Sequence, residues 1–318
     1  MLKKMSIKKI ITSSIVLMIV FLIYIIPTPS KKETKIPTIV EYVNVDVKTH
    51  TIYLLDNNNY VSKTSIRITN TKTEEIAREL IELMTQEGKN SDQIPSGFQP
   101  LINSNTKINS ISLTKDTLKV DLSKDFLTTS KDLEEKTLES LVYTLTSIDG
   151  VNYIILYIDG KILTKLPQNN INLPSTLNRD IGINKNYQLK NTKNITSTTI
   201  YYIHEYNNDY YYTPVTTINN DEREKIEIII DELGSTVKQN HLMSFLNNKT
   251  SVVDYKIQNK KMNVCFNENI FNDFDKKDIL EEVLYTISLS IYDNYDVEEI
   301  IFEVNNQEIT KTTLKSLE

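Results

Sequence analysis

The amino-acid sequence predicts an α+β protein in which an N-terminal transmembrane helix precedes two similar domains. Two observations predict the domains: short stretches recur in the same order in the second half of the chain, and each copy combines strand-like runs with two amphipathic helices. An apolar run near the N-terminus predicts the transmembrane helix. Within each domain we expect a small sheet with two helices packed on one of its faces.

The apolar run covers residues 10–26 and follows four lysines that lie among the first nine residues. Its 17 residues are close to the lower limit for crossing a hydrocarbon core of about 30 Å. The lysines predict a single-pass protein of the cell membrane with a cytoplasmic N-terminus and extracytoplasmic domains. We favour an uncleaved anchor over a cleaved signal peptide, because residues 25–30 lack the small-residue pattern of a cleavage site.

The composition and charge exclude a nucleic acid partner and an intrachain disulfide. Of the 318 residues, 39% are hydrophobic and 25% are charged, which suits two globular domains. Residues 1–35 carry a net charge of +6, so the remaining chain carries −12 of the total of −6. We expect no nucleic acid partner, because phosphate contacts need clustered Lys and Arg. The single cysteine, Cys265, excludes a disulfide within the chain.

Three stretches after the apolar run match between the two halves of the chain. Their offsets of 148, 142 and 146 residues are too long for a solenoid and suit a duplicated domain. The matched pairs are residues 51–53 with 199–201, 138–145 with 280–287, and 154–160 with 300–306. The boundaries that we expect are 1–30 for the cytoplasmic tip and anchor, 31–48 for a linker, 49–166 for the first domain, 167–197 for a second linker, and 198–314 for the second domain.

The elements of the first copy follow from periodicity and turn residues. Strand-like runs at 49–55 and 60–68 surround an Asp-Asn-Asn-Asn hairpin signal. A helix follows, and its apolar residues have helical spacing: Ile76, Leu80, Leu83 and Met84. Further strands are expected at 107–113, where the alternation leaves the inward face open, and at 117–122, where it is regular. A second helix has an apolar face of Leu138, Leu141, Val142 and Leu145, and a last strand covers 153–158.

The second copy repeats this order with different residues. Its first helix has an apolar face of Ile226, Ile229, Ile230 and Leu233. Its second helix has an apolar face of Leu280, Val283, Leu284, Ile287 and Ile291. Its hairpin joins residues 253–257 and 261–266.

One set of residues in the first copy comes in order over about 110 positions: Ile94-Pro95-Ser96-Gly97, then residues 106–113, 118–126, 141–146 and 151–161. In these residues the first copy resembles the GerM domain, a domain of sporulation and spore germination proteins. The second copy matches more weakly, at 264–270 and 284–287. Members of the family are exported and attached to the membrane, and they often carry two domains similar to the ring-building motif of sporulation channels.

The resemblance implies a non-enzymatic scaffold or assembly protein of the bacterial envelope, with protein partners or copies of itself. The chain departs from the family in two places. It has no cysteine directly after the apolar run to carry a lipid, which favours attachment by a transmembrane helix. Its second copy has Cys265-Phe266-Asn267 where the first has Asp121-Leu122-Ser123, so the two copies need not make the same contacts.

No residue pattern indicates catalysis, a metal site or a cofactor. The three histidines lie outside any H-E-x-x-H motif, and six glycines leave little material for a phosphate-binding loop. We interpret His204-Glu205 as a partly exposed polar pair rather than as metal ligands. We therefore expect no enzyme activity, no metal, no cofactor and no small-molecule substrate.

A dense group of tyrosines occupies a hairpin at 201–212. Tyrosines on a strand can contact a protein partner or stack on sugar rings, and they are also good strand formers. The possible interface residues are Tyr202, Tyr206, Tyr210 and Tyr212. The alternative function that they suggest is binding of cell-wall glycan.

Overall fold

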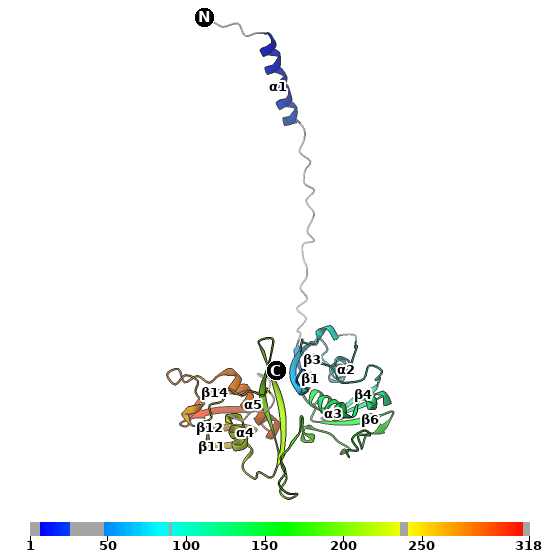
Figure 1. Cartoon of the computed structure of the whole chain (residues 1–318), viewed down its shortest axis with the longest axis vertical. Coiled ribbons are helices and arrows are strands. Elements are labelled where there is room, and N and C mark those ends of the chain that lie inside the picture. The colour runs from blue at the N-terminus through cyan, green and yellow to red at the C-terminus, as the bar shows by residue number, and fades with distance from the viewer. Residues whose placement is uncertain (1–6, 26–47, 89–90, 236–240, 314–318) are drawn as a thin grey trace. The chain divides into compact units, whose positions relative to one another are not determined.

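The computed structural model describes residues 7–25, 48–88, 91–235 and 241–313. The chain divides into two compact units, Met1–Val45 and Asp46–Glu318 (Figure 1). The expected linker at 31–48 and the first six residues lie almost wholly outside the described residues.

The described part of the first unit is one helix, α1 (Ile7–Ile25). Its described apolar side chains, from Ile11 to Leu22, are each more than half exposed. Among the described residues, no helix is both long and apolar enough to cross a membrane. This finding does not support the transmembrane helix that we expected over residues 10–26.

The second unit contains two four-stranded sheets with the same strand order. In the first repeat the order is β4-β5-β6-β7, and in the second it is β11-β12-β13-β14. The two central strands of each sheet are parallel and the outer pairs are antiparallel. The bounds are β4 (Ile108–Thr114), β5 (Thr117–Leu122), β6 (Tyr153–Ile158), β7 (Lys161–Ile162), β11 (Val252–Gln258), β12 (Lys261–Phe266), β13 (Glu299–Val304) and β14 (Gln307–Thr313).

Each repeat carries two α-helices, as its apolar periodicity predicts. The first repeat has α2 (Thr73–Leu83) and α3 (Lys131–Leu145), and the second has α4 (Lys225–Gly234) and α5 (Glu281–Asn294). In each repeat the longer helix connects the two parallel strands of the four-stranded sheet. The described residues also form four short 3₁₀ helices, η1 (Ser91–Gln93), η2 (Lys124–Thr128), η3 (Arg179–Ile181) and η4 (Glu268–Ile270).

The third sheet is shared by both repeats, which differs from the expected architecture. Two antiparallel hairpins, β1–β2 and β9–β10, join through β2 and β10, where Tyr212 pairs with Lys63. The sequence places each hairpin in its own domain, but pairing across the repeats gives both hairpins a longer hydrogen-bonded sheet. The bounds are β1 (Lys48–Asp56), β2 (Val61–Ile68), β3 (Phe98–Gln99), β8 (Asn186–Tyr187), β9 (Thr196–Tyr206) and β10 (Asp209–Asn219).

The apolar faces predicted for the four helices are confirmed. All of the residues named for α2, α3 and α4 are buried, and Val283, Ile287 and Ile291 of α5 are buried as well. Leu280 and Leu284 are partly buried and pack against the core of the second repeat. In each repeat this core also contains residues of the shared sheet, such as Ile52 and Ile200.

The inward face of β4, which the sequence left open, is Ile108, Ile111 and Leu113. These side chains are not spaced by two throughout, because the strand register shifts between Ile108 and Ser110. Such a bulge inserts one residue and reverses the alternation locally. The regular alternation expected for 117–122 is confirmed in β5, where Leu118, Val120 and Leu122 are fully buried.

Candidate functional site at the interface between the repeats

Two tyrosines at equivalent positions of the repeats meet at the interface. Tyr53 of β1 and Tyr201 of β9 are 148 residues apart, and their hydroxyl oxygens are 2.8 Å apart. Both side chains are buried, and the ring of Tyr143 from α3 packs edge-on against Tyr53 at 5.4 Å between centroids. The three tyrosines belong to a separate apolar cluster that also contains Leu55, Val61, Leu101, Ile183 and Leu289.

Two further pairs of equivalent residues also contact each other. Asp56 Oδ2 lies 3.0 Å from Nδ1 of His204, again 148 residues away. Ser62 and Thr213, which pair with the residues that directly follow the two tyrosines, have hydroxyl oxygens 2.6 Å apart. Contacts between equivalent positions are the mark of a two-fold interface. The repeats are therefore joined about a local pseudo-two-fold axis, like the subunits of a symmetric dimer.

The long helix of each repeat binds the backbone of its own first strand. The N–H of Tyr53 donates to Oγ1 of Thr144, and the N–H of Tyr201 donates to Oγ of Ser290, each at 2.9 Å. On the other side of the same residue, Oγ of Ser140 donates to the carbonyl oxygen of Tyr53 at 2.5 Å. Because these groups lie on the edge of a strand, the helices supply partners that no neighbouring strand provides there.

The helix contacts correct the alignment of the repeats. Thr144 and Ser290 bind equivalent tyrosines and are 146 residues apart. The sequence match of 138–145 with 280–287 gives an offset of 142 and is therefore wrong by four residues. The error is close to one helical turn of 3.6 residues, so both alignments superimpose the same apolar face, and the hydrophobic pattern cannot separate them.

A buried ion pair ties the connection between the repeats to the second repeat. Arg179 of η3 contacts the carboxylate of Asp293 from α5 through Nη1. The guanidinium also donates to Thr146 and Ser147 at the end of α3, at 3.1 and 2.7 Å. It lies 5.0 Å from the centre of the Tyr143 ring and 5.7 Å from that of Tyr53, within the range of cation–π attraction.

The second oxygen of Asp293 accepts a hydrogen bond from the hydroxyl of Tyr201 at 2.8 Å. Burial alone would lower the pKa of Arg179, but the nearby Asp293 carboxylate holds it well above its ordinary value. Burial also raises the pKa of Tyr201, so its hydroxyl keeps its proton. Arg179 is thus a cation and Tyr201 a donor, and both oxygens of the Asp293 carboxylate are paired.

His204 belongs to a buried polar cluster, not to an exposed pair. Its side chain is fully buried, whereas Glu205 is exposed, which corrects our interpretation of His204-Glu205. Asp56 Oδ2 also accepts from Ser62 Oγ at 2.9 Å and from the Tyr211 hydroxyl at 3.0 Å. Burial would raise the pKa of Asp56, but hydrogen bonds from His204, from the backbone N–H of Tyr60 and from Ser62 lower it below its ordinary value, with that of His204 foremost.

The four tyrosines named from the sequence occupy four different environments. Tyr202 is buried, and Tyr212 stacks on Tyr285 with 5.4 Å between ring centres. Tyr206 covers Gly97, which has a φ of +93°. Tyr210 is the exposed one of the four, at 47%, and it packs against Phe245. A strand turns successive side chains to opposite faces, so a tyrosine-rich hairpin need not form one aromatic surface.

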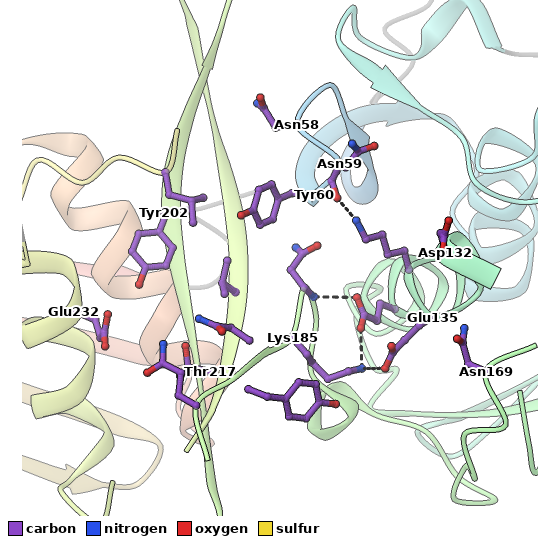
Figure 2. A pocket seen from close by; sticks show the side chains of 18 of the residues that line it. Asn58, Asn59, Tyr60, Asp132, Glu135, Asn169, Lys185, Tyr202, Thr217 and Glu232 are labelled. Atoms are coloured by element: carbon purple, nitrogen blue, oxygen red, sulfur yellow. Dashed lines mark hydrogen bonds and ion pairs between the residues drawn. The ribbon is translucent and has the colours of Figure 1, made fainter. Parts of the chain in front are cut away.

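A polar groove of about 800 Å³ lies between the repeats. In Figure 2, Lys185, Glu135 and Asp132 lie on one wall, while Tyr202 and Glu232 lie on the opposite wall. Nζ of Lys185 bridges two carboxylates of α3, Glu135 at 2.6 Å and Glu139 at 2.7 Å. No residue pattern predicts this groove, because its walls come from both repeats and from the connection between them.

Comparison with known proteins agrees with this architecture. Residues 51–164 match the family model described as sporulation and spore germination. The chain is 31% identical over 265 residues to the spore germination protein GerM of Bacillus subtilis strain 168, covering 80% of this chain and 71% of that protein. The solved tandem GerMN domains of GerM from Bacillus subtilis superimpose with a TM-score of 0.73 at 29% identity, over 82% of this chain and 92% of that one. The resemblance found in the sequence is confirmed, and the chain belongs to the GerM family of sporulation and spore germination proteins.

Proposed function

We propose that this chain is a membrane-attached, extracytoplasmic and non-enzymatic scaffold that helps to assemble an envelope complex during sporulation or germination. The observation that carries this proposal is the interface between the repeats. Three pairs of equivalent residues and a buried ion pair fix two folded repeats against each other. An interface of this kind holds the surfaces of the two repeats in one relative orientation, as a scaffold requires.

The proposed contact surface is the outer edge of β11 in the second repeat. This strand ends its sheet, and it exposes two apolar side chains, Val253 at 66% and Ile257 at 43%. The corresponding edge strand of the first repeat, β4, exposes the polar residues Asn109, Ser110 and Ser112 instead. An edge strand with exposed apolar side chains can add a strand or a surface from another chain. The second repeat therefore supplies the partner contact in this proposal.

Membrane attachment is proposed for the N-terminal segment. The exposed apolar side chains of α1 and the four lysines among the first nine residues suit contact with a lipid surface whose head groups are anionic. The attachment holds the body on the extracytoplasmic side, as the positive charge of the N-terminus favours. Fractionation of cells with a protease added from outside tests this directly: a protected body would contradict the proposed topology.

Crosslinking in the native membrane tests the scaffold. A photoreactive residue at position 253 should trap a second chain, either another copy or a different protein. The matched control places the same residue at 109 on β4, where we expect much less product. Recovery of the monomer alone from both positions would refute the proposal. A Val253→Lys and Ile257→Lys double variant should lose the product without losing the fold, because both side chains are exposed.

A further inference from the structure

The polar groove between the repeats has the size of a ligand site. Its volume of about 800 Å³ lies within the range of about 300 to 1,000 Å³ that small-molecule sites occupy. Its walls come from α3, the turn between β1 and β2, β8, the β9–β10 hairpin and the end of α4. None of the contacts that join the equivalent residues lies in it.

Uncharged hydrogen-bonding groups line one side of the groove. Asn186 and Gln188 flank Tyr187, and within the described residues their side-chain amides make no hydrogen bond. Each amide offers both a donor and an acceptor, which is the pair that an acetamido group or a sugar hydroxyl requires. Asn186 is half-buried and Gln188 is exposed, and amides two positions apart can bind successive polar groups of a chain-like ligand.

Aromatic side chains line the same groove as these amides. Tyr187 is 63% exposed and lines the groove, and Tyr60 and Tyr202 line it as well. An exposed tyrosine next to amides offers an apolar face and a polar rim to one ligand. Sugar rings have this dual character, because their C–H groups form apolar faces and their hydroxyl groups lie around the edge.

The charges of the groove exclude a strongly anionic ligand. Lys185 is already bound to both Glu135 and Glu139. Lys136 donates to the carbonyl oxygen of Asn59, and among the described residues neither Lys136 nor Lys131 makes an ion pair. Asp132 and Glu232 add two more carboxylates, which can accept hydrogen bonds from hydroxyl groups. A phosphate-bearing polymer would meet more negative than positive charge here.

We propose that this groove binds an uncharged glycan chain of N-acetylated amino sugars, the chemistry of a cell-wall glycan backbone. Tyr187 is assigned as the stacking platform, and Asn186 and Gln188 are assigned to the acetamido groups. The site differs from the tyrosine hairpin that first suggested glycan binding, since only Tyr202 of that group lines the groove. The inference is independent of the β11 contact, because the two surfaces share no residue.

Calorimetric titration of the purified full-length protein in detergent with a tetramer of N-acetylglucosamine tests the inference. Wild-type protein should bind the tetramer, and Tyr187→Ala should weaken binding about tenfold, the effect of losing one stacking contact of 1.4 kcal/mol. The Asn186→Ala and Gln188→Ala double variant should weaken it by a similar factor. A polyglycerol phosphate of comparable length should neither bind nor compete.

The matched control is Tyr210→Ala, which removes an exposed tyrosine of the hairpin that lies outside the groove. It should leave binding unchanged. Absence of binding by wild-type protein at millimolar tetramer would overturn the proposal, and so would a loss caused by Tyr210→Ala but not by Tyr187→Ala. Because Tyr187 is exposed, its variant should keep the wild-type melting temperature, which separates a lost contact from a lost fold.

Discussion

The hydroxyl of Tyr53 lies 2.8 Å from the hydroxyl of Tyr201, and these two residues occupy the same position in the two repeats. Tyr201 donates its own proton to Asp293, so in the Tyr53–Tyr201 bond Tyr53 is the donor and Tyr201 the acceptor. The hydrogen bond between these equivalent residues is therefore asymmetric: the first repeat supplies the donor and the second repeat supplies the acceptor. Arg179 then balances the carboxylate at the end of this chain of hydrogen bonds.

The direction of this chain predicts unequal effects of removing the two hydroxyl groups. Tyr53→Phe removes one hydrogen bond and should lower the free energy of unfolding by about 1 kcal/mol. Tyr201→Phe removes two, one of them to a buried carboxylate, and should cost about 2 to 3 kcal/mol. Urea unfolding at pH 7 measures both. A larger loss for Tyr53→Phe would contradict the assigned direction.

Removing Arg179 should leave the Asp293 carboxylate without its cation. The Asp293 side chain is only 3% exposed, whereas Arg179 is 26% exposed, so we expect Arg179→Ala to cost about 2 to 4 kcal/mol, less than for a fully buried pair. The Arg179→Met and Asp293→Asn double variant should be more stable than Arg179→Ala, since it leaves no unpaired charge. If the double variant lost as much free energy of unfolding as its two single variants lose together, Arg179 and Asp293 would not be energetically coupled. Denaturant midpoints of wild type, Arg179→Ala, the Arg179→Met and Asp293→Asn single variants and their double variant measure this.

Asp56 should make stability depend on acid pH. Its pKa is lower in the folded protein than the ordinary value of about 3.9. The stabilisation is therefore complete above about pH 5 and declines as the pH falls through the folded-state pKa. Asp56→Asn should be less stable than wild type at pH 7, and the difference should shrink below pH 4. The same series on Asp209→Asn, at the exposed first residue of β10, is the control. A difference that stays constant from pH 7 to pH 3 would contradict the role of the charge.

Gly97 should tolerate no side chain. Its φ of +93° disfavours L-residues, and a Cβ there would lie 2.8 Å from Cδ1 of Tyr206. We expect Gly97→Ala to cost about 1 to 3 kcal/mol. Combining it with Tyr206→Ala should remove the steric clash and leave only the backbone strain. The double variant should therefore lose less free energy of unfolding than the two single variants lose together. Thermal melts of the three variants check this, and strictly additive losses would show that Tyr206 does not restrict the site.

The helices and most strands were predictable because their signals are local. An apolar face such as Ile226, Ile229, Ile230 and Leu233 needs only helical spacing to be recognised. Such a face becomes buried whichever apolar surface of the protein it packs against, so its burial can be predicted without knowing that surface. The same locality explains the alignment error of four residues in the second helix, since a shift of about one turn preserves the face. The contacts of Thr144 and Ser290 were needed to fix the register.

The shared sheet and the groove were not predictable because they depend on pairing between distant segments. Nothing in the residues of β2 shows that it pairs with β10 rather than with a strand of its own repeat. The burial of His204 has the same cause: a histidine beside a glutamate looks exposed until the partner, Asp56 of the other repeat, is known. The match of residues 51–53 with 199–201 has the same offset of 148 residues as the pairs Tyr53–Tyr201 and Asp56–His204. The sequence alone does not reveal that residues at equivalent positions contact each other.

That the two repeats form one body can be tested most directly by native-state hydrogen exchange of the full-length protein in increasing urea. Peptides from α3 and α5, one in each repeat, should report the same free energy of opening and the same dependence on urea. Arg179→Ala should split them into two values. Two distinct values in wild-type protein would show that the repeats open independently and that the interface does not make them one body.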